Sequence, residues 1–237
     1  MIRRTKRLGK VDIELLNFTK KYPIVSGMMS RNQIYGVLYH LKSVIDRGVE
    51  GDVVELGCNV GTTSLFIKKF LDTYCPEKKF HVYDSFDGLP DKHEKDMTSS
   101  RSGDVFVRGA CKTSRDVFEK VLNHYGVGLP TINTGWFKEI PDSSYPSKIC
   151  FAFFDGDFYT SILDSFEKTF RKIQPGGIIL IDDISEGDLK NHGLPGAERA
   201  CQEFLKDKEE TYDYSGYPDE NFLFGKSSGG AKITKIS

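Results

Sequence analysis

Four aspartates in two short stretches of this chain could hold a cation. Asp155 and Asp157 follow the apolar run CFAFF, and Asp182 and Asp183 follow the apolar run IILI. If both runs are parallel strands, their carboxyl ends meet at one edge of the sheet, where folds of this kind bind ligands. Carboxylates brought together there repel one another unless a cation neutralises them. An all-oxygen donor set selects Mg²⁺, with Ca²⁺ or Mn²⁺ as substitutes, so we predict a metal held by Asp155, Asp182 and Asp183.

Asp157 and His192 are the two candidates for a general base. Asp157 stands two residues after Asp155, and in an extended segment both side chains project to the same side. It could therefore take a proton from a hydroxyl next to the metal. Asp157 has two alternative roles: it could orient a metal ligand, or it could cap the following helix. The Asp182–Asp183 pair could likewise be a simple helix cap. His192 lies in the polar loop after that pair and has a suitable pKa, although a loop histidine is commonly just solvated.

The stretch VVELGCNVGTTS is a candidate cofactor turn. Gly57 and Gly61 stand four apart, unlike the G-x-G-x-x-G of dinucleotide folds, and let a ligand approach the backbone. Glu55, inside the preceding strand, needs a cationic or hydrogen-bonding partner, and Asp84, at the end of the next strand, can accept both ribose hydroxyls. This order of acid, glycine turn and acid favours S-adenosylmethionine (SAM), whose sulfonium and amino groups are positive. A tight strand-to-helix turn without a ligand is the alternative for the glycines.

Alternating strand and helix patterns predict the scaffold that positions these residues. The alternation indicates βαβ units in a mostly parallel sheet, closed by a C-terminal hairpin in NFLFGKSSGGAKITKI. We expect strands at 51–57, 80–84, 131–134, 150–154 and 176–182, and helices at 34–45, 62–71, 117–125, 162–170 and 197–205.

The length and composition indicate one domain over residues 1–237. We expect an N-terminal helical extension (1–47) and a core of alternating strands and helices (48–237) that includes a lid loop (85–113). Its 33 basic and 34 acidic side chains leave a net charge of −1, which argues against a nucleic-acid partner. No apolar run is long enough for a membrane helix, and no secretory signal is visible. Five scattered cysteines predict reduced thiols in a cytoplasmic protein. Two roles are open for the extension: it covers the active site or it pairs subunits in a homo-oligomer.

Six segments resemble, in chain order, motifs of the macrocin O-methyltransferase (TylF/MycF-like) family. The matching segments run from about Met28 to Leu205 and are GDVVELGCNVGTTS, VYDSFDGLP, TGWFKEIP, FFDGDFYTS, PGGIILIDD and GAERACQEFL. The resemblance implies SAM- and Mg²⁺-dependent methylation of sugar hydroxyls or phenolic groups. It also implies a class I methyltransferase Rossmann-like fold, with seven strands of which the last is antiparallel.

The resemblance also implies roles for individual residues. It assigns the metal to the same three aspartates as above and supports Asp157 as the base. By their position after the third strand, Gly135 and Trp136 are expected to border the adenine, although an aromatic beside a sheet is also a common core residue. Ile184 follows the paired aspartates, where the family often has an aromatic residue. The implied cofactor contacts are Glu55, Gly57, Gly61, Thr62, Thr63, Asp84, Ser85, Gly135 and Trp136.

We therefore expect an O-methyltransferase acting on a sugar hydroxyl, in a free sugar, a nucleotide-linked sugar or a glycan. One alternative is a catechol or phenol acceptor, although enzymes of that kind lack the DGD element and more often use a lysine base. Another is a SAM-binding module without catalysis, against which the four intact aspartates argue.

Overall fold

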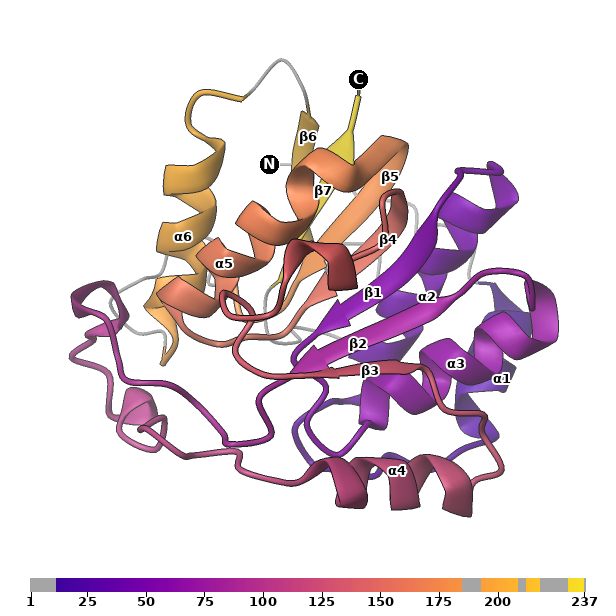
Figure 1. Ribbon diagram of the computed structural model, residues 1–237, viewed down its shortest axis with the longest axis horizontal. Coiled ribbons are helices and arrows are strands. Elements are labelled where there is room, and N and C mark those ends of the chain that lie inside the picture. Colours follow the sequence, from indigo (N-terminus) through magenta and orange to yellow (C-terminus); the bar gives the residue numbers. More distant parts are fainter. Residues whose placement is uncertain (1–11, 185–192, 209–211, 218–229, 237) are drawn as a thin grey trace, which may run out of the picture.

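The computed structural model describes residues 12–184, 193–208, 212–217 and 230–236. A seven-stranded sheet lies between two layers of helices (Figure 1). The strand order is β3-β2-β1-β4-β5-β7-β6; the first five strands in the chain are parallel, and β7 is antiparallel to both of its neighbours. This confirms the predicted class I methyltransferase fold with its C-terminal hairpin. The strands are β1 (Asp52–Leu56), β2 (Phe80–Asp84), β3 (Thr131–Thr134), β4 (Ile149–Phe154), β5 (Ile173–Ile181), β6 (Tyr212–Tyr217) and β7 (Gly230–Lys235).

Both faces of the sheet are covered because each strand alternates its side chains between them. In β4, Phe151 and Phe153 pack with residues of α1 to α4, while Ala152 and Phe154 pack with residues of α5 and α6. Such double burial explains why the central strands are continuous apolar runs. The helices are α1 (Ile13–Lys20), α2 (Arg31–Asp46), α3 (Thr62–Tyr74), α4 (Arg115–His124), α5 (Tyr159–Thr169) and α6 (Pro195–Leu205).

The hairpin is the element whose position the sequence predicted wrongly. We expected its first strand in NFLF, but the strand that pairs with β7 is β6 (Tyr212–Tyr217), which precedes NFLF in the chain. The segment YDYSGY alternates aromatic with small or polar residues, which is also a strand pattern. Residues 221–224, which carry NFLF, lie outside the described part of the chain.

The predicted lid, residues 85–113, is fixed at its middle to α5 and α6. Asp96 accepts hydrogen bonds from the backbone N–H of Tyr159 at 2.7 Å and of His93 at 2.8 Å. The His93 ring stacks on that of Tyr159 at 4.8 Å, and Arg199 of α6 donates to a backbone carbonyl of the loop. In Figure 1 the segment runs below α5 and α6, beside the carboxyl edge of the sheet.

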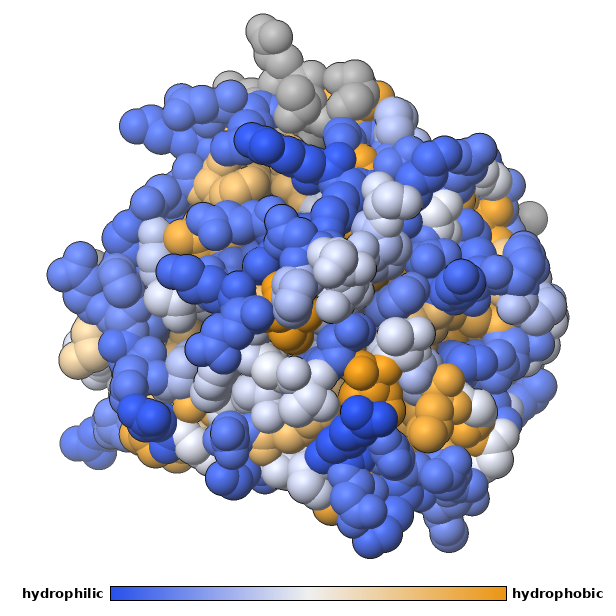
Figure 2. Space-filling model, in the orientation of Figure 1, coloured by the Kyte–Doolittle hydropathy of each residue, from blue (hydrophilic) through white to orange (hydrophobic). Residues whose placement is uncertain are grey.

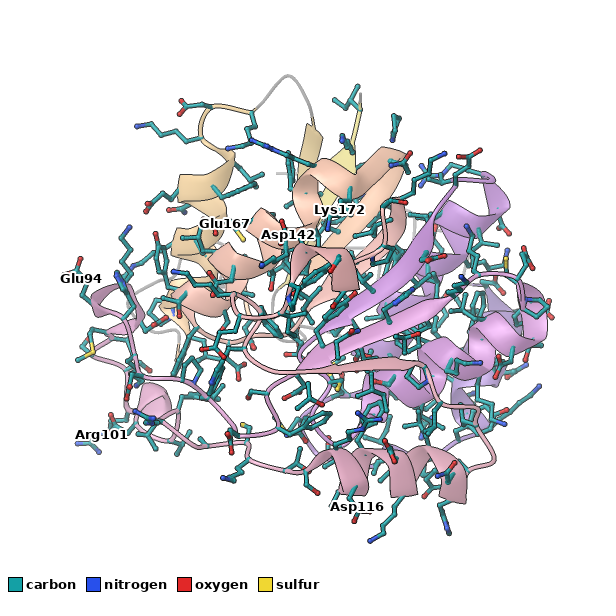
Figure 3. All side chains as sticks on the ribbon, in the orientation of Figure 1. Glu94, Arg101, Asp116, Asp142, Glu167 and Lys172 are labelled. Atoms are coloured by element: carbon teal, nitrogen blue, oxygen red, sulfur yellow. The ribbon has the colours of Figure 1, made fainter. Side chains whose placement is uncertain are left out.

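The surface is mainly polar on the face that Figure 2 shows, with apolar residues in small separate patches. Charged side chains such as Glu94, Arg101 and Asp116 stand at the outer edge of the molecule (Figure 3). Within the described ranges, no helix combines the length and the apolar character needed to cross a membrane.

Candidate active site

A cavity of about 380 Å³ opens at the carboxyl ends of the first four strands. Its wall contains the residue that ends or follows each of them: Gly57 after β1, Asp84 in β2, Gly135 after β3 and Asp155 after β4. This is the edge at which parallel α/β sheets bind ligands. The predicted site residues in the cavity wall are Gly57, Asp84, Ser85, Gly135, Trp136, Asp155 and Asp157.

The two glycines of the turn are required by the backbone. Gly57 has φ 91°, and a Cβ atom there would lie 1.9 Å from the carbonyl oxygen of Asp155. Gly61 has φ 89°, and its Cβ would lie 2.8 Å from Leu122 Cδ1. Both values of φ fall in the region that favours glycine. The missing side chains thus let β1 and β4 approach each other at the cavity wall and let α4 pack beneath the turn.

Asp84 holds the glycine turn in place. Its Oδ2 accepts hydrogen bonds from the backbone N–H groups of Cys58 and Asn59, both at 2.8 Å, and its Oδ1 accepts one from that of Phe86 at 2.7 Å. A carboxylate offers roughly four acceptor positions. Three are used by the chain itself, which leaves room for one ribose hydroxyl rather than the two expected from the sequence.

Glu55 presents a buried carboxyl oxygen without a partner directly beside this turn. The side chain is 1% exposed, and the Ser64 hydroxyl donates to its Oε2. Among the described residues, nothing hydrogen-bonds to its Oε1. Burial raises the pKa of Glu55 to about 8 against the opposing effect of Ser64, and the charge of Asp84 contributes to the rise. An orphaned buried acceptor fits a ligand that brings positive charge, as SAM does.

The other predicted cofactor residues lie behind the turn. Gly61, Thr62 and Thr63 are buried. Thr62 Oγ1 accepts a hydrogen bond from the Ser26 backbone N–H at 3.0 Å and lies 3.0 Å from Ser26 Oγ. These residues shape the start of α3 and join it to the segment that precedes α2.

The four aspartates converge at the ends of β4 and β5. Asp155, Asp157 and Asp183 each place a carboxylate oxygen within 4.8 Å of the other two. Asp157 and Asp183 are hydrogen-bonded to each other. Asp182 is close enough for its charge to raise the pKa of Asp155, second in effect to burial. The three carboxylates that lie closest together are therefore those of Asp155, Asp157 and Asp183, whereas the predicted metal ligands included Asp182 in place of Asp157.

A tight turn, not an extended segment, brings Asp157 to this group. Asp157 has φ 60°, and the Phe158 backbone N–H donates to the Gly156 carbonyl at 2.6 Å. A hydrogen bond between residues two apart closes a three-residue turn. The predicted extended conformation is wrong, because the turn replaces it. A Cβ at Gly156 would lie 2.8 Å from Ser161 Cβ, which accounts for the glycine of the DGD element.

The electrostatics of the cluster call for a cation. Burial, reinforced by the neighbouring carboxylates, raises the pKa of both Asp155 and Asp157 well above the usual range, and burial and Asp183 raise that of Asp182 to about 8. Without a cation these groups share protons, and a divalent ion can take the place of those protons. Burial and the aspartates raise the pKa of the nearby Cys111 thiol to about 11, so it stays neutral at physiological pH. The available donors are therefore carboxylate oxygens, which fit Mg²⁺.

Gln33, Asn59 and Arg108 belong to the site but were missed from the sequence. Gln33 Nε2 lies 3.3 and 3.4 Å from the two carboxylate oxygens of Asp182. Arg108 lines the cavity and pairs with Asp91 at 2.7 Å. The motif S-x-x-Q around Gln33 predicts only a helix start. His192, the second candidate base, lies outside the described residues.

Comparison with known proteins identifies the family. The sequence pattern of Macrocin-O-methyltransferase (TylF) matches residues 9–211. The 8-demethyl-8-(2,3-dimethoxy-alpha-L-rhamnosyl)-tetracenomycin-C 4'-O-methyltransferase of Streptomyces olivaceus is 28% identical over 187 residues, which cover 75% of this chain and 70% of that protein. The mycinamicin III 3''-O-methyltransferase of Micromonospora griseorubida is 25% identical over 190 residues, which cover 77% of this chain and 72% of that protein.

Solved structures share the fold. The O-methyltransferase NovP aligns with a TM-score of 0.70 at 20% identity, covering 94% of this chain and 88% of its own. An O-methyltransferase from Bacillus cereus, in complex with SAH, aligns with a TM-score of 0.58 at 15% identity, covering 95% of this chain and 90% of its own. Because the family pattern spans most of the chain, including the glycine turn and all four aspartates, this protein belongs to the macrocin O-methyltransferase family and is a SAM-dependent O-methyltransferase.

Proposed function

We propose that this enzyme is Mg²⁺-dependent and methylates a hydroxyl of a sugar, whether free, nucleotide-linked or part of a glycan. The observation that carries the proposal is the group of carboxylates from Asp155, Asp157 and Asp183, two of which line the same cavity as the glycine turn and Asp84. The S. olivaceus relative is named for a substrate that carries a rhamnosyl group, which supports a sugar acceptor.

The proposed metal ligands are Asp155, Asp182 and Asp183, with Mg²⁺ as the ion and Ca²⁺ or Mn²⁺ as substitutes. When bound there, Mg²⁺ supplies positive charge beside the acceptor hydroxyl and helps to orient it. The raised pKa values of Asp155 and Asp182 support this assignment, because buried carboxylates that repel one another gain most from a bound cation.

Asp157 is the proposed general base. It lines the cavity, and its turn holds the carboxylate next to Asp155 and Asp183. In the transfer step the acceptor oxygen forms a bond to the methyl carbon, the bond between that carbon and the sulfonium sulfur breaks, and the hydroxyl proton moves to Asp157. A cationic sulfonium donor, a neutral alcohol and the Asp157 carboxylate thus become a neutral thioether, an ether and a protonated carboxyl group. A base that faces the acceptor in this way contributes roughly 100-fold or more to the rate.

The proposed SAM contacts are centred on the glycine turn. Glu55 offers its free carboxyl oxygen to positive charge, and Asp84 has acceptor capacity for one ribose hydroxyl. Gly135 and Trp136 border the proposed adenine position, since both are in the cavity wall and Trp136 is half-buried. Gly57 and Ser85 also lie in the cavity wall, while Gly61, Thr62 and Thr63 support the turn from behind.

A cytoplasmic location and a single functional domain are also part of the proposal. All five cysteines are free thiols and four of them are buried, which is typical of proteins from a reducing compartment.

An acceptor screen tests the proposed function. The full chain, SAM and Mg²⁺ are incubated with nucleotide sugars, glycan fragments and catechols, and products are detected by mass spectrometry. We expect one added methyl group on a sugar that carries a vicinal diol. Transfer only to catechols would replace the sugar proposal with the phenol alternative. Tight SAM binding without turnover on the whole panel would indicate a binding module.

A further inference from the structure

Gln33 reaches the aspartate cluster from the N-terminal helices that precede the sheet. It lies in the first turn of α2, and its Nε2 is 3.3 Å from Asp182 Oδ2 and 3.4 Å from Asp182 Oδ1. Both side chains are buried, at 7% and 6% exposed. The amide therefore spans both oxygens of one carboxylate in a place from which water is largely excluded.

The orientation of this amide is set by the start of α2. Gln33 Oε1 accepts a hydrogen bond from the Ser30 backbone N–H at 2.9 Å, and Ser30 Oγ accepts one from the Gln33 backbone N–H at 3.2 Å. These two bonds form a capping box. Because Ser30 uses the amide oxygen, the amide NH₂ group must face Asp182, where it can only donate.

The chain before Gln33 touches the rest of the site as well. Ser26 bonds to Thr62 at the start of α3, and Met28 lines the cavity. Three residues of one short segment thus contact the cofactor helix, the cavity and the aspartate cluster. The path from Ser26 to Gln33 is short enough that each contact limits the movement of the others.

The orientation of the Asp182 carboxylate depends on the hydrogen bonds that it makes. Its backbone N–H donates to the Phe154 carbonyl at 3.0 Å, which ties the residue to the end of β4. The carboxylate above this anchor still rotates unless hydrogen bonds fix it, and groups that orient a metal ligand typically affect metal affinity about 10- to 100-fold. Gln33 donates to both oxygens and so fixes the plane of the carboxylate.

We propose that Gln33 is a positioning residue for the metal site: it holds the Asp182 carboxylate in the orientation that binds the divalent cation, so that the N-terminal helices form part of this site. The inference rests on the proposed function, because it takes the aspartates as ligands of Mg²⁺.

Q33E separates this role from the role of Gln33 in the helix start. Glutamate at this position keeps an acceptor for the Ser30 N–H, and it is a preferred capping-box residue. It replaces the donor that faces Asp182 with an oxygen. S30A is the complementary variant. It removes the hydroxyl that caps the helix, but it leaves the Ser30 backbone N–H to hold the Gln33 amide. Q33M removes both side-chain bonds without adding charge.

The experiment measures Mg²⁺ and SAM binding to the full chain by calorimetry, together with thermal unfolding. We expect Q33E to weaken Mg²⁺ binding at least about tenfold while SAM affinity stays near that of the wild type. It should also lower the melting temperature, because it places a further buried carboxyl group against Asp182. Q33M should weaken Mg²⁺ binding by a similar factor and also lower the melting temperature. S30A should lower the melting temperature and leave Mg²⁺ affinity within about twofold.

Mg²⁺ affinity in Q33E and Q33M equal to that of the wild type, or tighter in both, would overturn the inference while leaving the proposed metal intact. Absence of Mg²⁺ binding in the wild type itself would overturn the proposed metal and this inference together. Under turnover, the same role predicts a raised Mg²⁺ requirement in Q33E with an unchanged KM for SAM.

Discussion

Asp96 accepts a hydrogen bond at 2.7 Å from the backbone N–H of Tyr159, the first residue of α5. The residue before the helix, Phe158, provides no side-chain cap. Asp96 belongs to the loop after β2, so a distant segment caps the helix that directly follows the Asp155–Asp157 turn. The loop is in this way part of the support for the aspartate cluster.

Replacing Asp96 tests this support. D96A leaves the backbone N–H groups of Tyr159 and His93 without their acceptor, and we expect the free energy of unfolding to fall by about 2 kcal/mol or more. Urea unfolding measures the loss. D116A is the matched control, because Asp116 is an exposed aspartate of α4 (Figure 3), and it should change stability by no more than about 0.5 kcal/mol. Equal effects of the two variants would contradict the assigned role of Asp96.

Gly57 should tolerate no side chain. G57A imposes a positive φ on alanine and drives its Cβ to 1.9 Å from the Asp155 carbonyl oxygen. G48A is the control, because Gly48 also has a positive φ but has open space around it. The conformational penalty alone costs roughly 1–2 kcal/mol, so we expect G48A to lose about that much and G57A clearly more, with loss of SAM binding. Similar unfolding curves for the two variants would show that the close approach of β1 and β4 is unimportant.

Glu55 should make the stability of the ligand-free enzyme depend on pH. Burial raises its folded-state pKa to about 8 from the ordinary value of 4.5, so the folded state binds this proton more tightly than the unfolded state. Its contribution to stability is complete below the unfolded-state pKa and is lost as the pH rises through about 8. Between these values the wild type should lose up to about 1.4 kcal/mol per pH unit relative to E55Q.

Urea unfolding at several pH values, without SAM or metal, measures this difference. The aspartates with raised pKa values act in the same direction in both proteins, so the difference between the two curves reports Glu55 together with its effect on Asp155. E167Q, at an exposed residue of α5 (Figure 3), is the control and should follow the wild type. Parallel curves for the wild type and E55Q would mean that Glu55 does not hold a proton in the folded state.

Substitutions of Asp157 and Asp182 should affect different quantities, kcat in the first case and the Kd for Mg²⁺ in the second. D157N removes the proposed base, and we expect kcat to fall about 100-fold or more while the Kd for Mg²⁺ stays within a few-fold of the wild type. D182N removes a proposed ligand and should raise that Kd at least about tenfold. Calorimetry and initial rates distinguish the two. Loss of Mg²⁺ binding in D157N would instead make Asp157 a metal ligand, as its closeness to Asp155 and Asp183 would allow.

The sheet could be predicted from the sequence because its strands carry local signals. FHVYD and TINT correspond to β2 and β3 residue for residue, and the doubly buried β4 shows up as CFAFF. The first hairpin strand was misplaced because NFLF and YDYSGY both have strand patterns, and only pairing with β7 chooses between them. Local propensity does not contain that information.

The site was predictable as far as it depends on strand ends. Asp84, Asp155 and Asp183 come together because parallel strands end at one edge, which the order of elements already implies. The left-handed turn at Asp157 was not predictable, since aspartate adopts that conformation only in certain contexts. The contact of Gln33 with Asp182 joins residues 149 apart, and the sequence around Gln33 shows only a helix start.

Methyl transfer to a vicinal-diol sugar, measured before and after metal removal, tests the central claim most directly. We expect the wild type to lose activity on chelation and to regain it when Mg²⁺ is added back. D155N should stay inactive at every Mg²⁺ concentration, because Asp155 is both a proposed ligand and a member of the tightest carboxylate group. Transfer that survives chelation, and that persists in a double variant with D155N and D182N, would contradict the account.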